Sequence, residues 1–277
     1  MGAAEKAAVA ARIYRTVTEF AHHTGMSDLR FRLRAAGLHL AASAAVAAVI
    51  AGVAFGLWFP APYRQLSDAL PLFLLIAGVD LVLGPFVTGL VFRAAKPAAE
   101  RRRDVGVVVL LQLLALGYGV WVLHLARPVH LVFEIDRFRV VHAADVPEDL
   151  LAAASPQWRS LPLTGPTLIA ARPFRSPTES ADATLAALQG VAIGARPDFW
   201  QDYAAAVPRV LERATPVSTL YARFPNQRAA IDAAVGQTGR RADDLRSLPL
   251  VSREHAWTVL LDARSAQPLA FLPLDSF

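Results

Sequence analysis

The sequence predicts a membrane protein in which three transmembrane α-helices precede a small mixed α/β extracytoplasmic domain with an antiparallel sheet. Three observations lead to this prediction: long apolar runs, basic residues gathered around those runs, and a tail with alternating apolar and polar residues. Hydrophobic residues make up 55% of the 277 residues and charged residues 18%, against about 45–50% and about 25% in ordinary soluble domains. The composition therefore indicates membrane spans.

The apolar runs are each long enough to cross a bilayer. They cover residues 38–59, 72–92 and 105–126. At 1.5 Å per residue the first run is roughly 30 Å long, which matches the hydrocarbon core of a bilayer. Because this run ends in Trp58, Phe59 and Pro60 rather than in a small-residue cleavage site, a transmembrane span is favoured over a signal peptide.

Basic residues define the expected orientation and domain boundaries. Residues 1–126 carry 12 Lys or Arg and 7 Asp or Glu, whereas residues 127–277 carry 16 of each. By the positive-inside rule, residues 1–37 form a basic cytoplasmic segment, residues 38–126 the transmembrane region in contact with lipid, and residues 127–277 a periplasmic domain. This arrangement places the protein in the bacterial inner membrane. Met26 is a second candidate start.

Asp80 is an acidic residue inside the second apolar run. About eight residues separate it from the outer end of the run, which corresponds to roughly 12 Å of depth at 1.5 Å per residue. A charge in the membrane costs at least about 2.5 kcal/mol, so this side chain is expected to face protein or water. Ala77, Gly84 and Thr88 share its helical face and form a stripe of small residues along which another helix can approach closely.

Two interpretations of this face remain open. In the first, Asp80 fixes the packing of the protein's own helices, with the hydroxyl group of Tyr118 as its expected partner at the same depth. In the second, a guest helix docks on the face, or Asp80 is a protonation site. The candidate docking face consists of Ala77, Asp80, Gly84 and Thr88. Because Gln112 and Tyr118 are the main other polar groups in the bundle, ion transport is weakly supported.

The tail is expected to fold into strands and helices. Residues 126–146 alternate in two stretches around Asp136 and Arg137, which predicts a β-hairpin, and residues 255–274 predict a terminal hairpin. Helical patterns cover residues 178–190, 198–213 and 225–236. The mixed charges of residues 240–246 are typical of a solvated helical face.

The tail shows no pattern typical of a catalytic, cofactor or metal site. The chain has no cysteine, which excludes thiolate chemistry. His130, His142 and His255 lack the spacing of zinc motifs, and no serine lies in the G-x-S-x-G context of a hydrolase. We therefore expect no enzyme activity, no cofactor and no metal.

A protein partner is favoured over nucleic acid. The tail carries no net charge, and its expected location outside the cytoplasm excludes a nucleic-acid partner. Phe199, Trp200 and Tyr203 form a candidate patch for a periplasmic partner. Packing of these rings in the core is the alternative.

Three stretches of the sequence together carry a family resemblance. They are LLIAGVDLVLGPFVTGLVF at residues 74–92, VVLLQLLALGYGVWVLHLARPVHLVFEIDRFRVVHAADV at residues 108–146, and FLPL at residues 271–274. The chain thus resembles the type IV pilin accessory proteins of the TfpX/TfpZ type, most strongly over residues 72–146. The resemblance implies a non-enzymatic, chaperone-like role toward the major type IV pilin in pilus assembly. It supplies no catalytic residues.

A pilin subunit waits in the inner membrane as one apolar helix with a globular periplasmic head. We expect the candidate docking face to receive that helix and the tail to hold the head, with the pilus assembly machinery as a further candidate partner. The main alternative is a membrane-anchored periplasmic sensor or scaffold unrelated to pili. An enzyme, either a tail-domain hydrolase or a glycosyltransferase acting on pilin, is the third class, although membrane enzymes that glycosylate pilin usually carry more spans.

Overall fold

The structure is a computed structural model that describes the backbone of residues 3–91 and 97–277, and the side chains of residues 26, 28–91 and 97–277. Two compact units divide the chain. We call Met1–Ala51 with Phe73–Val120 the helical unit, and Gly52–Leu72 with Trp121–Phe277 the tail unit. Arg93 and Lys96, two of the charges behind the expected orientation, lie outside the described residues.

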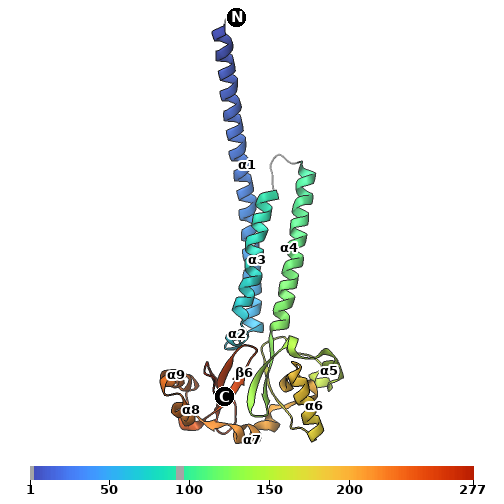
Figure 1. Ribbon diagram of the computed structural model, residues 1–277, viewed down its shortest axis with the longest axis vertical. Helices are drawn as coiled ribbons and strands as arrows, with labels where there is room; N and C mark the ends of the chain where they lie inside the picture. The colour runs from blue at the N-terminus through green and yellow to red at the C-terminus, as the bar shows by residue number, and fades with distance from the viewer. Residues whose placement is uncertain (1–2, 92–96) are drawn as a thin grey trace. The chain divides into compact units, whose positions relative to one another are not determined.

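Three long helices supply the helical unit (Figure 1). They are α1 (Ala3–Val53), α3 (Ala69–Val91) and α4 (Ala98–Ala126). The segments Asp28–Trp58, Ala69–Val91 and Ala98–Ala126 are long and apolar enough to cross a membrane. The predicted three apolar helices are therefore confirmed, and by length and composition they indicate a membrane protein.

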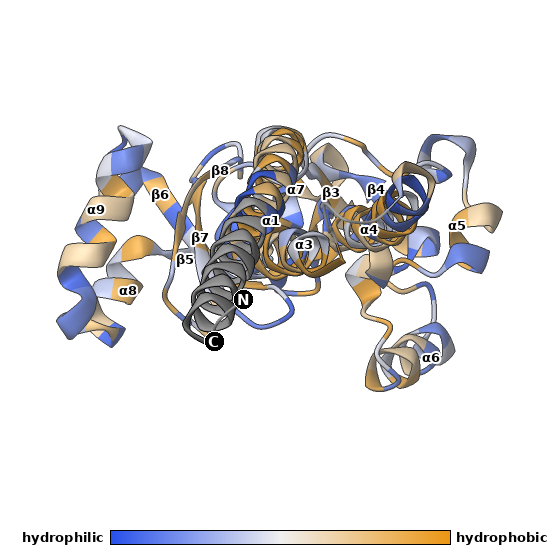
Figure 2. Ribbon diagram, turned by 90° about the horizontal axis from the view of Figure 1, so that it is seen from above, coloured by the Kyte–Doolittle hydropathy of each residue, from blue (hydrophilic) through white to orange (hydrophobic). Residues whose placement is uncertain are grey.

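These helices leave most of their apolar surface uncovered. Within the most apolar 18-residue windows of α1, α3 and α4, only 11%, 17% and 6% of the residues are buried inside the described chain. Figure 2 colours α3 and α4 as predominantly hydrophobic. Since such surface is stable only against lipid or another apolar helix, the helical unit is built to be surrounded by apolar neighbours.

An eight-stranded sheet organises the tail unit. Its strands are β1 (Pro128–Glu134), β2 (Arg137–His142), β3 (Thr167–Ala171), β4 (Trp200–Asp202), β5 (Thr215–Pro216), β6 (Leu245–Val251), β7 (Ala256–Asp262) and β8 (Pro268–Leu272). The order across the sheet is β4-β3-β1-β2-β6-β7-β8, and β5 pairs with β6. The two predicted hairpins are confirmed as β1–β2 and β7–β8, both antiparallel.

The prediction of an antiparallel sheet is wrong, because the sheet is mixed. β1 pairs in parallel with β3, and β2 pairs in parallel with β6. Parallel neighbours need a crossover connection of about a dozen residues or more, which residues 143–166 and the much longer segment 143–244 provide. Alternation within a strand indicates one buried face but not the direction of the neighbouring strands. The two parallel pairings could therefore not be predicted from the sequence.

Short helices complete the tail unit. They are α2 (Tyr63–Leu66), α5 (Glu148–Ala153), α6 (Pro177–Leu188), α7 (Tyr203–Arg213), α8 (Val217–Arg223) and α9 (Arg228–Thr238). The predicted helices correspond to α6, α7 and α9, although α7 starts at Tyr203 because residues 200–202 pair with β3 as strand β4. The helical face expected over residues 240–246 is wrong, since strand β6 begins at Leu245.

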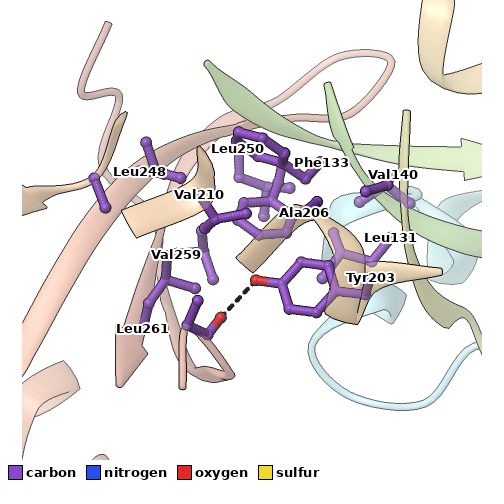
Figure 3. Packing of buried hydrophobic residues seen from close by; sticks show 14 of the residues in the cluster. Leu131, Phe133, Val140, Tyr203, Ala206, Val210, Leu248, Leu250, Val259 and Leu261 are labelled. Atoms are coloured by element: carbon purple, nitrogen blue, oxygen red, sulfur yellow. Dashed lines mark hydrogen bonds between the residues drawn. The ribbon is translucent and has the colours of Figure 1, made fainter. Parts of the chain in front are cut away.

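The sheet and helices of the tail unit enclose three clusters of buried apolar residues. Figure 3 shows the central cluster, in which α7 contributes Tyr203, Ala206 and Val210. Strands β1, β2, β6 and β7 contribute the other labelled side chains, which are Leu131, Phe133, Val140, Leu248, Leu250, Val259 and Leu261. The parallel pairing of β2 with β6 thus joins the β1–β2 hairpin to the antiparallel strands β6, β7 and β8, which lie far away in the sequence, in one core.

The loop between the first two spans, residues 60–71, packs as part of the tail unit. We call it the first loop. Leu66 of α2 is 1% exposed and belongs to the central cluster. The ring of Tyr63 packs edge-on against Phe271 of β8, with 5.6 Å between ring centroids. A segment that the sequence presents as a connection between spans therefore supplies core residues to the tail.

Candidate functional site

Asp80 on α3 is buried, with 9% of its surface exposed, and pairs with a residue of α4. The side-chain amide of Gln112 donates a hydrogen bond to its carboxyl group, with 2.7 Å between Nε2 and Oδ1. The same nitrogen lies 3.3 Å from the backbone oxygen of Asp80. A polar residue inside an apolar bundle thus has a protein partner, as the cost of burying it requires.

Gly84 makes room for this contact. A Cβ atom at position 84 would overlap the side-chain amide of Gln112. Gly78, in the same helix, has nothing within 4 Å of the position that a Cβ atom would occupy. Gly84 is therefore the place where α3 lets the Gln112 amide lie across its surface and reach Asp80.

Helix α1 adds two polar residues to the same region. His39 Nδ1 lies 2.5 Å from Thr88 Oγ1 on α3, and Ser43 Oγ lies 3.5 Å from Gln112 Nε2. The sequence reasoning missed both contributions. The available signal was their spacing, because residues four apart share one face of a helix.

A groove of about 650 Å³ opens between α1 and α4 beside these polar groups. We call it the α1–α4 groove. Asp80 and Thr88 of α3 line it, and apolar residues such as Leu38, Val109 and Leu113 form its walls. A second cavity of about 390 Å³ lies between α3 and α4, and Asp80 and Gln112 line both spaces. The pair therefore stands at the boundary between two openings in the helical unit.

The candidate docking face is the most buried face of α3. Ala77 and Asp80 are 7% and 9% exposed, Gly84 is buried, and Thr88 is half-buried. Within the helical unit these residues meet α1 and α4, so a guest helix would reach the face through the α1–α4 groove or the α3–α4 cavity. A guest's docking there stays a prediction.

Tyr118 lines the α3–α4 cavity together with Asp80. The partner that the structure gives Asp80 is Gln112, six residues earlier on α4, or roughly 9 Å at 1.5 Å per residue. A hydrogen bond between Tyr118 and Asp80 stays a prediction.

The three aromatic residues of the candidate periplasmic patch are core residues. Phe199 is fully buried, and Trp200 and Tyr203 are each 6% exposed. The indole N–H of Trp200 donates to the Gly194 carbonyl at 2.8 Å, and the Tyr203 hydroxyl donates to the Ala266 carbonyl at 2.6 Å (Figure 3). With their polar ends satisfied, these rings are stable inside, so they do not form an exposed patch and the core alternative holds.

A polar cluster clamps the first loop to the sheet. His142 at the end of β2 is 1% exposed, and its Nε2 lies 2.9 Å from Ser67 Oγ. Its Nδ1 lies 3.0 Å from Asp145, which also forms an ion pair with Arg253. Burial acts to raise the pKa of Asp145, but the hydrogen bonds from His142 and Arg253 outweigh it and lower the pKa to about 2. We call these residues the loop clamp.

The other two histidines considered as metal ligands, His130 and His255, also have hydrogen-bond partners within the tail unit. His130 Nδ1 lies 2.6 Å from Thr167 Oγ1, and burial lowers the pKa of His130 to about 4. His255 Nε2 lies 3.0 Å from Asp68 of the first loop. Among the described residues, no group of three or more His, Asp or Glu is placed to hold a metal ion.

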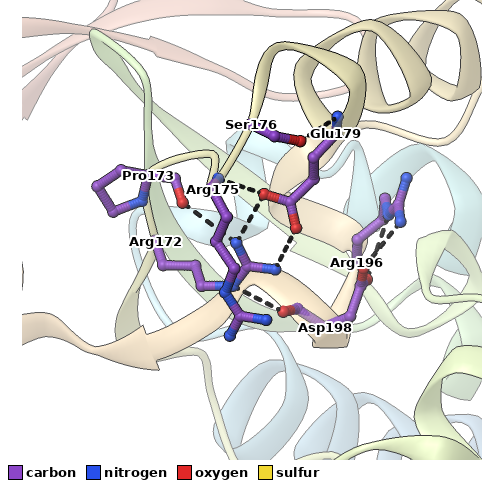
Figure 4. Close-up of polar contacts among 7 residues, drawn as sticks. All are labelled: Arg172, Pro173, Arg175, Ser176, Glu179, Arg196 and Asp198. Atoms are coloured by element: carbon purple, nitrogen blue, oxygen red, sulfur yellow. Dashed lines mark hydrogen bonds and ion pairs between the residues drawn. The ribbon is translucent and has the colours of Figure 1, made fainter.

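Figure 4 shows a charged cluster at the start of α6. Arg172 binds Glu179 through two hydrogen bonds of 2.7 and 3.0 Å, and the backbone N–H of Glu179 donates to Ser176 Oγ at 3.1 Å. The hydrogen bond from Arg172 lowers the pKa of Glu179 to about 2. The cluster caps α6 and ties it to the residue after β3, which is a structural role.

Two known proteins are similar in sequence to this chain over most of its length. Residues 27–68 match the family model described as Fimbrial assembly protein FimB. The fimbrial assembly proteins of serogroup I and of serogroup E1 from Dichelobacter nodosus are each 32% identical over 234 residues, which cover 84% of this chain and 91% of each relative. The fimbrial assembly protein of serogroups C1 and C2 from the same organism is 36% identical over 124 residues, which cover 45% of this chain and 95% of that relative. No solved structure matches the chain.

Proposed function

Because the chain belongs to the fimbrial assembly protein family, we propose that it is a non-enzymatic, chaperone-like protein of the bacterial inner membrane that holds the major type IV pilin during assembly. The names of the relatives support a role in fimbrial assembly and an association with pilus components. In this proposal the helical unit, which contains Asp80, binds the helix of the pilin, and the tail unit binds its globular head.

The observation that carries the proposal is the α1–α4 groove, with apolar walls and the polar residues Asp80 and Thr88 in its lining. Its lining residues extend from Phe31 to Val46 on α1, roughly 22 Å at 1.5 Å per residue. A space of that length, within helices that are otherwise uncovered, suits one apolar helix such as the membrane anchor of a pilin subunit.

The tail is the part that meets the globular head of the pilin in this proposal. Arg30, Arg32 and Arg34 precede the apolar part of α1, and three further arginines lie in the first turns of α4. By the positive-inside rule those ends are cytoplasmic, and the tail unit is then periplasmic, on the side where the head of a pilin lies.

Replacement of Asp80 tests the proposal. We expect Asp80→Leu to lower pilin co-purification with the full chain by about threefold or more. An interhelical contact in a membrane is worth about 0.6 kcal/mol, which corresponds to a factor of about three. The abundance of the variant should stay normal, because leucine replaces a buried polar group, and the Gln112 amide keeps the backbone oxygen at position 80 and Ser43 Oγ within 3.5 Å. Val82→Leu is the matched control, since Val82 lies on the same helix, is 65% exposed and lines neither opening.

Two results would count against the proposal. If Asp80→Leu lowers the abundance of the chain while the pilin recovered per molecule stays unchanged, Asp80 only holds the protein's own helices together. If the unaltered chain recovers no pilin, the protein serves assembly as a scaffold or sensor and not as a pilin chaperone.

A further inference from the structure

The helical unit contains a buried hydrogen-bond acceptor without a partner. Gln112 Oε1 is buried and forms no hydrogen bond with any described residue. The Nε2 atom of the same amide is directed to Asp80 and lies near Ser43. Because the donor end of the amide is engaged by Asp80, the carbonyl oxygen is the end left over.

Such an oxygen is costly where it lies. A buried acceptor that has lost its hydrogen bond to water keeps the full cost of desolvation. Gln112 lines both the α1–α4 groove and the α3–α4 cavity, and its neighbours Val108 and Leu116 on α4 line both spaces as well. A donor that enters either space from outside the chain would remove that cost without disturbing the contact with Asp80.

We infer that Gln112, held in place by its contact with Asp80, forms an acceptor site that selects a guest helix carrying a hydrogen-bond donor, such as a hydroxyl or amide, within its apolar segment. This inference rests on the proposed function, because it takes a helix as the occupant of the groove. Asp80 and Gln112 line the groove among apolar side chains, and Gln112 Oε1 is the acceptor that lacks a partner among the described residues. A guest with a donor at the matching depth complements both, whereas a guest carboxylate would bring further acceptor oxygens beside Asp80 and should bind weakest.

Gly84 is part of this site through its lack of a side chain. A Cβ atom there would overlap the Gln112 amide and push it off α3. The glycine therefore positions the acceptor, and the contact with Asp80 fixes which end of the amide faces the guest.

A binding assay with synthetic guest helices tests the inference. The full chain is reconstituted in phosphatidylcholine vesicles and labelled at Ala99→Cys, which is a unique thiol because the chain has no cysteine. Leucine-rich guest helices of about 22 residues carry a second dye and either Thr or Val at one position, which is moved along the guest in a scan. Thr and Val have nearly the same shape, so energy transfer reports the contribution of the hydroxyl group.

We expect the Thr guest to bind about threefold more tightly than the Val guest, as about 0.6 kcal/mol for an interhelical hydrogen bond in a membrane implies. The preference should appear at one depth and on one face of the guest. It should vanish in Gln112→Met, which keeps the length of the side chain but has no amide. Leu114→Met, at a position of α4 that is 63% exposed and lines neither opening, should leave the preference intact.

If the unaltered chain binds the Thr and Val guests equally at every position of the scan, which we call a flat scan, the inference is overturned. This outcome does not depend on whether a variant of Gln112 folds. A flat scan is also what a water molecule bound to Gln112 Oε1 would produce. A preference that persists in Gln112→Met would overturn the assignment as well. If pilin co-purifies while the scan is flat, the donor rule alone fails; if neither guest nor pilin binds, the proposed function fails with it.

Discussion

At the scale of single residues, the contact between Asp80 and Gln112 depends on a third residue that takes no direct part in it. Gly84 lies one turn from Asp80 on α3, where any larger side chain would occupy the space of the Gln112 amide. A stripe of small residues is commonly a surface for close helix approach. Here it also gives a polar side chain of the next helix a path to a buried carboxyl group.

Gly84→Ala should therefore disturb the helical unit, and Gly78→Ala should not. The added methyl group at position 84 meets Gln112, whereas a Cβ at position 78 meets nothing within 4 Å. Overpacking of this kind typically costs about 1–3 kcal/mol. Denaturant titration of the full chain in detergent, followed by helical circular dichroism, measures the difference. Equal stability of the two variants would show that Gln112 can leave Asp80 at no cost.

The sequence predicted that the Asp80 side chain faces protein or water and offered Tyr118 as its partner within the bundle, whereas the structure pairs it with Gln112. Depth counted from the end of the apolar run at residue 72 favoured Tyr118. Helix α3 starts earlier, at Ala69, so Asp80 lies about one turn deeper along its helix than the run suggested. The contacts of His39 and Ser43 were not predicted, because the first apolar run was considered only as a membrane span. A single polar residue on a span does not indicate which helix it contacts.

At the scale of elements, the first loop is the least expected feature. Leu66 is buried in the central cluster, while Ser67 contacts His142 of β2 and Asp68 contacts His255 in the turn before β7. In the sequence the loop resembles a short connection, because its apolar residues are too few to show a period. The hairpins could be predicted from local alternation and a tight turn. The packing of the first loop on the sheet and the parallel strand pairs could not, because they depend on contacts between residues far apart in the sequence.

The loop clamp predicts a specific response to acid. The pKa of Asp145 is lowered to about 2 in the folded protein, below its ordinary value, so its contribution to stability is present above about pH 4 and is lost as the pH falls toward about 2. For a partly exposed group we expect a loss of about 1–2 kcal/mol over that range. Denaturant unfolding of the full chain in detergent between about pH 5 and about pH 2, followed by near-ultraviolet circular dichroism of the tail, measures it.

In Asp145→Asn this part of the acid response should be absent, because the amide does not titrate. Asp149→Asn is the control, since Asp149 is an exposed residue of α5 outside the clamp. An unchanged pH profile in Asp145→Asn would mean that the clamp does not contribute to the stability of the tail.

At the scale of the whole molecule, the two units divide the chemistry of the chain. The tail unit packs its apolar residues into three closed clusters, and His130 Nε2 and Arg209 Nε are the buried side-chain atoms without a hydrogen-bond partner among its described residues. The helical unit instead leaves apolar surface uncovered and holds two openings, both of them lined by Asp80 and Gln112. A protein that assists assembly by holding another helix would show this contrast, because its binding site is complete only with the guest in place.

The most direct test of this account is photo-crosslinking in cells from two neighbouring positions of α4. Leu113 and Leu114 are 61% and 63% exposed, but only Leu113 lines the α1–α4 groove. With a photoreactive amino acid at position 113, we expect capture of the major pilin, and at position 114 we expect little or none. Equal capture at both positions, or capture at neither while the protein is abundant, would contradict the groove as the site that holds the pilin helix.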